Sequence, residues 1–150
     1  MKVRVFSLLT LICFATTVNA NGLTCPSSIK AGSKLTITAN IKNNDCDSPM
    51  QINRTLISYA GNSSGSSLGL QGPFVNSLAR QIAIAPATDC WYDEWSGQGY
   101  GEGTSKSFTI SSPAVIPATM AGTLIVAAAG VMDVNGKITV ASACTISVTK

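Results

Sequence analysis

The sequence predicts an all-β fold, an antiparallel β-sandwich of about seven strands. Apolar and polar residues alternate with a period of two along several segments, as they do in half-buried strands. Glycine, proline, asparagine, aspartate and serine separate these segments, and no segment combines helical periodicity with a cap at each end. The expected strands are residues 22–29, 34–42, 50–59, 80–85, 104–111, 123–132 and 137–149.

The first three strands follow from local pattern and turn chemistry. In the first strand, Pro26 is expected at an edge or a bulge, because proline cannot donate a hydrogen bond to a ladder. A turn at 30–33 leads into KLTITANIK, in which every second residue is apolar. The face shared by these apolar residues consists of Leu35, Ile37, Ala39 and Ile41. A loop at 43–49, rich in turn-forming residues, then precedes the third strand.

The second half of the chain contains two expected loops and the clearest hairpin. The Ser- and Gly-rich segment 61–72 is expected to be mobile. The strand RQIAIA ends at Pro86, and residues 87–103 are expected to form a loop before the strand TSKSFTIS. The last two strands turn at Asn135-Gly136, because Asn-Gly suits a type I′ turn whose twist matches that of its strands.

The N-terminal segment MKVRVFSLLTLICFATTVNA has the organisation of a secretion signal. Lys2 and Arg4 give a positive n-region, a mostly apolar run follows, and Val18-Asn19-Ala20 is a suitable cleavage site. We therefore expect residues 1–20 to be removed, which leaves 21–150 as a single β-sandwich domain. A retained anchor would need about 20 apolar residues, and this run is shorter and interrupted by polar residues.

Loss of the signal brings the net charge close to zero. The whole chain has 10 basic and 7 acidic side chains, so removal of Lys2 and Arg4 leaves 8 basic side chains and a net charge of +1. No basic stripe remains for nucleic acid, and no basic amphipathic helix for a membrane surface. We expect neither a nucleic-acid partner nor a membrane span after signal cleavage.

Four cysteines remain after signal cleavage: Cys25, Cys46, Cys90 and Cys144. An even number of cysteines in an exported chain favours two disulfides and an oxidising compartment, either the periplasm or the exterior of the cell. Their spacing contains no CxxC pair, so a cysteine-ligated metal is less favoured than disulfides.

Two stretches, CPSSIKAGSKLTITANIKNN and IPATMAGTLIVAAAGVMDVNGKITVASACTISV, resemble immunoglobulin-like or fibronectin-like modules of exported bacterial proteins. The resemblance covers residues 22–150 at the level of topology and implies an immunoglobulin-like sandwich. The chain departs from antibody-type domains, because the strand at 50–59 has no core Trp and the strand at 123–132 has neither Cys nor a corner Tyr. Such a fold implies no function by itself.

Sequence alone leaves three disulfide pairings open for four cysteines. The implied topology favours Cys46–Cys90, because the loops after the second and fourth strands share one end of a seven-strand sandwich. It also favours Cys25–Cys144, because the first and last strands lie side by side.

The absence of histidine removes many chemistries. It excludes Ser-His-Asp and Cys-His nucleophilic sites and His-ligated zinc or copper sites. The chain has no P-loop, and its glycine run at 97–103 does not lead from a strand into a helix. Asp89 and Glu102 could face each other across a folded loop as glycosidase carboxylates do. With no further catalytic motif, we expect no enzymatic activity.

Residues 81–105 carry four acidic side chains and no Lys or Arg. Calcium takes about six to eight oxygen ligands, so this acidic set is a weak calcium candidate. Its members are Asp89, Asp93, Glu94 and Glu102, to which Asp45 and Asp47 would add if Cys46 pairs with Cys90. The DxDxDG ligand spacing is missing, which favours a solvated acidic loop without a metal or other cofactor.

The segment ATDCWYDEWSGQGYGEG concentrates the aromatic residues. In an extended strand Trp91 and Trp95 would share one side with Asp93 between them, and Tyr100, among glycines, is expected to be the most exposed. Aromatic faces beside carboxylates stack on sugars or anchor protein partners, so Trp91, Trp95, Tyr100 and Asp93 form the candidate ligand-binding set. We nevertheless expect the tryptophans to pack against the end of the sandwich, because large exposed apolar patches are uncommon without a partner.

These observations favour a secreted, non-enzymatic binding module for a protein or glycan at the cell surface or in the periplasm. The alternative is a structural subunit of a pilus-like surface assembly that uses strand exchange, although the ending CTISVTK lacks the aromatic residue of chaperone–usher subunits. A small hydrolase that uses carboxylates ranks third.

Overall fold

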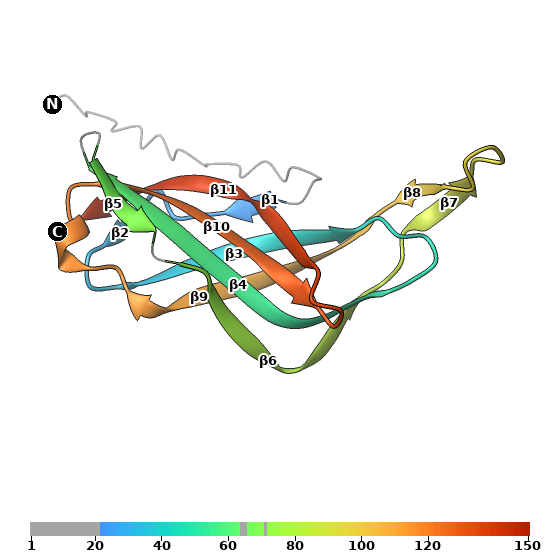
Figure 1. The fold of residues 1–150 in the computed structure, drawn as a ribbon, viewed down its shortest axis with the longest axis horizontal. Coiled ribbons are helices and arrows are strands. Elements are labelled where there is room, and N and C mark those ends of the chain that lie inside the picture. Colours follow the sequence, from blue (N-terminus) through green and yellow to red (C-terminus); the bar gives the residue numbers. More distant parts are fainter. Residues whose placement is uncertain (1–21, 64–65, 71) are drawn as a thin grey trace, which may run out of the picture.

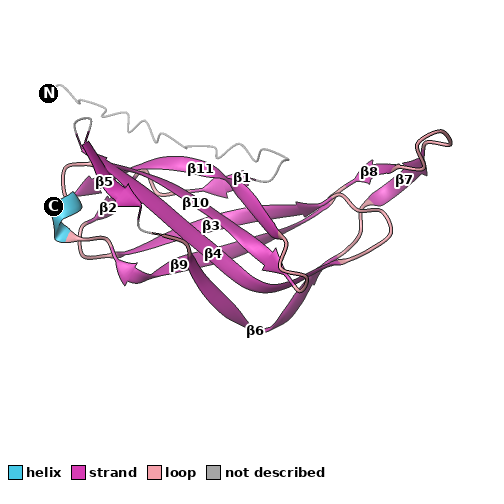
Figure 2. Ribbon diagram, viewed as in Figure 1, coloured by secondary structure: helices cyan, strands magenta, loops and turns pink. Residues whose placement is uncertain are grey.

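The computed structural model describes residues 22–63, 66–70 and 72–150. Within these ranges strands dominate, and the one helical element is the single 3-10 turn Ala118–Met120 (Figure 2). The predicted all-β class is therefore confirmed. The expected secretion signal at 1–20 lies outside the described residues.

The described strands form two packed sheets and a separate hairpin (Figure 1). They are β1 (Gly22–Thr24), β2 (Ser28–Lys30), β3 (Lys34–Asn43), β4 (Met50–Ser63), β5 (Ser66–Leu70), β6 (Phe74–Ile84), β7 (Thr88–Tyr92), β8 (Gly99–Glu102), β9 (Thr104–Val115), β10 (Leu124–Asp133) and β11 (Ile138–Thr149). One sheet has the order β1-β3-β9, and the other has the order β2-β11-β10-β4 with both β5 and β6 on the outer edge of β4. The strands β7 and β8 pair with each other.

The first predicted strand is divided between the two sheets. The strand β1 pairs antiparallel with β3, whereas β2 pairs in parallel with β11. Pro26 lies between them, where its missing N–H costs no ladder hydrogen bond. The N-terminal segment therefore crosses from one sheet to the other and closes one side of the sandwich.

Much of the segment 61–72, which was expected to be mobile, is paired strand, and its residues 64, 65 and 71 lie outside the described residues. The strand β4 continues to Ser63, and β5 returns alongside it with Ala60 opposite Leu70. The strand β6 is also longer than the predicted 80–85, since it begins at Phe74 and pairs with β4 on either side of a register shift. Glycine and serine conceal these strands from a pattern search because they carry no apolar alternation.

The core lies between the two sheets and is built from the predicted inward faces. All four apolar residues of the 34–42 segment are buried on β3, as predicted. They face alternate residues of β10, of which Ile125 and Val131 are fully buried. Tyr59 adds a buried ring that stacks on Phe74, with the ring centroids 6.3 Å apart. Period-two alternation thus identified the buried face of β3 correctly.

The disulfide Cys25–Cys144 joins the segment between β1 and β2 to β11. It confirms the predicted pairing of the first and last strands' cysteines. Together with the second disulfide, Cys46–Cys90, it indicates a chain that folds in an oxidising environment. None of the helical structure in the described residues has the length and apolar character needed to cross a bilayer.

Two neighbouring positions on β10 provide a direct test of the sandwich. Ile125 is 0% exposed and Val126 is 49% exposed, so their side chains lie on opposite faces of one sheet. We expect Ile125→Ala to lower the free energy of unfolding by about 2–5 kcal/mol, because it leaves a cavity in the core. The control Val126→Ala is expected to change it by less than about 0.5 kcal/mol. Urea unfolding measures both, and equal losses would contradict the assigned faces.

Candidate functional site

The strands β7 and β8 form a hairpin that projects from one end of the sandwich (Figure 1). Trp91 lies opposite Tyr100 and Tyr92 lies opposite Gly99 in an antiparallel register. The prediction of a loop over 87–103 was therefore wrong in part, because most of this segment is paired strand. Its glycines and short length give no strand signal in the sequence.

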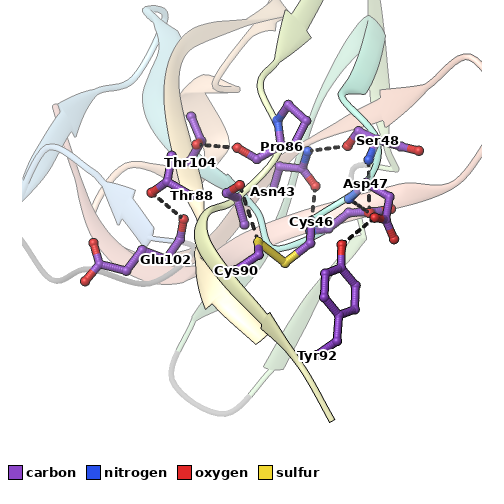
Figure 3. Close-up of a disulfide and its surroundings, with 12 residues drawn as sticks. Asn43, Cys46, Asp47, Ser48, Pro86, Thr88, Cys90, Tyr92, Glu102 and Thr104 are labelled. Atoms are coloured by element: carbon purple, nitrogen blue, oxygen red, sulfur yellow. Dashed lines mark hydrogen bonds between the residues drawn. A yellow bond between two sulfur atoms is a disulfide. The ribbon is translucent and has the colours of Figure 1, made fainter. Parts of the chain in front are cut away.

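The base of the hairpin is fastened to the loop that follows β3 (Figure 3). The disulfide Cys46–Cys90 joins the two segments and confirms the second predicted pairing. Beside it, the Ala87 N–H donates to the Asp45 carbonyl at 2.8 Å. The Thr104 hydroxyl donates to the Pro86 carbonyl at 2.7 Å, which ties the two ends of the hairpin together.

A buried amide supports this base. Asn43, which is 2% exposed, donates from Nδ2 to the carbonyls of Ser48 at 3.0 Å and Ala85 at 3.1 Å. Its Oδ1 accepts from the Asp45 N–H at 3.1 Å. Because one side chain satisfies backbone groups of the 43–48 loop and of the chain leaving β6, it fixes both segments from which the hairpin emerges.

Two glycines of GQGYGEG, Gly99 and Gly101, make room for the disulfide. A Cβ on Gly101 would lie 2.6 Å from both Cys90 Sγ and the Thr88 carbonyl oxygen. A Cβ on Gly99 would lie 2.9 Å from Tyr92 Cε1 and 3.2 Å from Cys46 Cβ. Gly99 and Gly101 are therefore required by the packing of the hairpin base, whereas a Cβ on Gly97 would meet no other atom.

The hairpin turn is organised by Asp93. One carboxylate oxygen accepts from the Trp95 N–H at 2.9 Å, and the other accepts from the Ser96 hydroxyl at 3.0 Å. The Gly97 N–H donates to the Asp93 carbonyl at 2.8 Å, with Gly97 at a φ of +67° that favours glycine. The hydrogen bond from the Trp95 N–H, followed by that from Ser96, holds the pKa of Asp93 below its usual 3.8.

Tyr92 links the hairpin to the loop after β3 through a side-chain hydrogen bond. Its hydroxyl donates to a carboxylate oxygen of Asp47 at 2.6 Å (Figure 3). This hydrogen bond favours the neutral phenol, and with the nearby negative charge of Asp47 and Asp45 it raises the pKa of Tyr92 above its usual 10.0. Asp47 was considered only as an additional calcium ligand, although its position next to Cys46 could have indicated that it would lie near the hairpin.

The tryptophans do not pack against the sandwich, so that prediction was wrong. Trp91 is 61% exposed and Trp95 is 98% exposed. Trp91 stacks on Tyr100 with centroids 4.7 Å apart, as directly opposed residues in a hairpin can. Because the strand ends at Tyr92, Trp95 belongs to the turn and not to an extended strand shared with Trp91. Trp95, and not Tyr100, is therefore the most exposed aromatic residue of the hairpin.

The carboxylates of the calcium candidate are not gathered. Across the described parts of the chain, no three Cys, Asp or Glu side chains come together as a metal site would require. Asp93 instead uses both carboxylate oxygens within its turn. Glu102 lines a small hollow with Lys42, Gly103 and Ser105, and Asp89 does not line it. The geometry thus gives no support to a pair of carboxylates facing each other across a cleft.

A polar cleft of about 400 Å³ lies beside the hairpin base, between the 42–51 and 133–139 segments. Lys42 and Lys137 line it together with Asp45 and Asp133. The Asp133 carboxylate accepts the N–H groups of Asn135 and Lys137 within the β10–β11 turn, both at 2.8 Å. The cleft contains no aromatic surface, so the exposed rings of the hairpin remain the stronger candidate for recognition.

No family model matches the chain, and no curated protein matches it. Among solved structures, the chain is similar in outline to Spo0M, a sporulation control protein from Bacillus subtilis, with a TM-score of 0.43 and 9% identity. The match covers 89% of this chain and 51% of that one, so the chain spans about half the length of Spo0M. A likeness at this level carries no argument about function.

Gly101→Ala tests the packing of the hairpin base. The new methyl group must displace Cys90 or the Thr88 carbonyl, so we expect β7 and β8 to separate locally. Amide exchange at Tyr92 and Tyr100 should accelerate by about tenfold or more, which corresponds to roughly 1.4 kcal/mol of local opening. Glu102→Ala is the control, because Glu102 is the next residue along the chain and its side chain is exposed. Unchanged exchange in the Gly101 variant would contradict the close contact.

The lowered pKa of Asp93 gives the hairpin turn a defined response to acid. The contribution of the carboxylate to the stability of the folded turn is fully present above the ordinary pKa of 3.8 and is lost as the pH falls through the lower folded pKa. The chemical shift of the Trp95 amide proton, followed by NMR, should therefore move only below the ordinary aspartate range. Asp93→Asn should remove this titration, and a Trp95 shift that titrates above pH 4 would contradict the assignment.

Proposed function

We propose that this chain is an exported, non-enzymatic binding module that docks onto a protein partner through the β7–β8 hairpin. The observation that carries the proposal is Trp95, a tryptophan that is 98% exposed on a turn whose backbone is hydrogen-bonded to Asp93. A large apolar ring kept in water by an ordered turn gains free energy when a partner covers it.

The surroundings of the rings favour a cationic protein surface over a glycan. The hairpin is a convex projection, whereas small ligands prefer concave sites that enclose most of their surface. Its segment carries four acidic side chains and no basic ones, so a partner with Lys or Arg gains both ion pairing and cation–π contact. Rigid aromatic residues on a projecting element are typical anchors of protein interfaces.

The proposal includes export and an immunoglobulin-like architecture. Export is supported by the N-terminal sequence pattern and by the two disulfides. The immunoglobulin-like character is supported by two packed sheets whose N-terminal segment pairs first with β3 and then, in parallel, with β11. The periplasm or the cell surface is the expected location.

Tryptophan fluorescence tests the proposal, because Trp91 and Trp95 are the chain's 2 tryptophans. In a Trp91→Phe variant the emission reports Trp95 alone and should shift to shorter wavelength when a peptide rich in Lys, Arg and Leu binds. Trp95→Ala, assayed by peptide anisotropy, should weaken binding by roughly 30-fold, as expected for a hot-spot residue worth about 2 kcal/mol. Val126→Ala, an exposed apolar change on the sandwich, should leave the affinity unchanged.

Matched acidic peptides and neutral oligosaccharides complete that experiment. Neither should shift the Trp95 emission if the partner is a cationic protein surface. A shift produced by a neutral oligosaccharide would replace the protein partner with a glycan. No shift with any of the three probes would overturn the hairpin as a recognition element.

A further inference from the structure

Charge is separated between the two ends of the sandwich. All seven acidic side chains of the chain lie at the hairpin end: Asp45, Asp47, Asp89, Asp93, Glu94, Glu102 and Asp133. They occupy the loop after β3, the hairpin itself and the end of β10, which all lie at the same end of the two sheets (Figure 1). The same end also carries three basic side chains, Lys42, Lys106 and Lys137, against the seven acidic ones. The hairpin end is therefore acidic on balance as well as aromatic.

The opposite end is basic. Lys30 at the end of β2 and Lys34 at the start of β3 are exposed and flank the turn at 31–33. Lys150 follows β11 at the same end (Figure 1). We call Lys30, Lys34 and Lys150 the basic end.

An apolar residue accompanies these lysines. Val115 at the end of β9 is 47% exposed and is the register partner of Lys34. The turn beneath them is held by reciprocal hydrogen bonds, since the Gly32 N–H donates to the Ile116 carbonyl and the Ile116 N–H donates to the Ser33 carbonyl, both at 2.8 Å. The basic end thus offers an ordered surface with ammonium groups beside exposed aliphatic surface, which is the complement of a Trp ring beside carboxylates.

The two ends cannot neutralise each other within one molecule. The strand β3 alone separates Lys34 from Asn43 by its 10 residues, about 30 Å at 3.3 Å per residue. Charges in water are screened over about 8 Å at physiological ionic strength. Their attraction can therefore be realised only between molecules.

We propose that copies of this chain associate head to tail, with the hairpin of one copy seated on the basic end of the next. Trp95 covers Val115 and contacts a lysine ammonium group, while Glu94 and its neighbours pair with the remaining lysines. The two contact surfaces are different and lie at opposite ends, so the contact is heterologous and each added copy presents a new free hairpin. Such a contact builds an open chain of molecules and not a closed dimer. This inference rests on the proposed docking role of the hairpin and names its partner.

Sedimentation velocity of the purified, disulfide-bonded chain tests the inference. The weight-average sedimentation coefficient should rise with concentration from the micromolar to the millimolar range without reaching a dimer plateau, and high salt should reduce it. Trp95→Ala, which removes the anchor, and the double variant Lys30→Glu/Lys34→Glu, which reverses the basic end, should each weaken association by at least about tenfold. Arg80→Glu is the matched control, since it reverses an exposed charge on β6 between the two ends. It should associate like the unchanged chain.

A mixture of the two defective variants distinguishes this arrangement from other contacts. The Trp95→Ala variant keeps its basic end, and the double lysine variant keeps its hairpin, so one intact pair of surfaces exists between them. An equimolar mixture should form heterodimers and then stop, because neither free end of the heterodimer is functional. A mixture that stays monomeric would overturn the head-to-tail contact, as would an unchanged chain that is monomeric at millimolar concentration.

The outcome separates this inference from the proposed function. If the chain stays monomeric but Trp95 emission still shifts with the Lys- and Arg-rich peptide, the hairpin binds a different protein and only the self-association is overturned. If neither association nor an emission shift occurs, both are overturned. Circular dichroism of each variant verifies that loss of association does not reflect loss of fold.

Discussion

The position of the β7–β8 hairpin on the sandwich depends on one covalent constraint, the disulfide Cys46–Cys90 at its base. An isolated two-stranded hairpin is at best marginally stable in water, because it has no core of its own. Here the disulfide joins the hairpin to a loop whose backbone is held by the buried amide of Asn43. The disulfide and these hydrogen bonds thereby anchor the β7–β8 hairpin to the sandwich, although the hairpin contributes little to the apolar core.

This constraint determines which residues can surround it. Gly99 and Gly101 lie against the disulfide, where a side chain would collide with sulfur or backbone atoms. The larger residues of the hairpin are consequently displaced outward, and Trp91 stacks on Tyr100 across the strands. The close packing of Gly99 and Gly101 at the base therefore accompanies the exposure of the Trp91 and Tyr100 rings.

Charge acts at a longer range than these contacts. The acidic residues lie in the loop after β3, in the β7–β8 hairpin and at the end of β10, outside the apolar core. Lys30 and Lys34 lie at the opposite end of the sandwich, and the core between the two sheets carries no charged side chain. In such a monomer the two ends carry opposite electrostatic potentials. The acidic end of one copy therefore attracts the basic end of another.

Local sequence patterns were sufficient to predict the all-β class, the inward face of β3 and the formation of two disulfides. Each follows from local information, because alternation of residues such as Leu35 and Ile37 reports the face of its own strand. The disulfide partners required the fold-level topology as well. The exposure of Trp95 and the pairing of Gly99–Glu102 with β7 were evident only in the folded chain. A residue's exposure depends on what the rest of the chain places over it, and no local pattern contains that information.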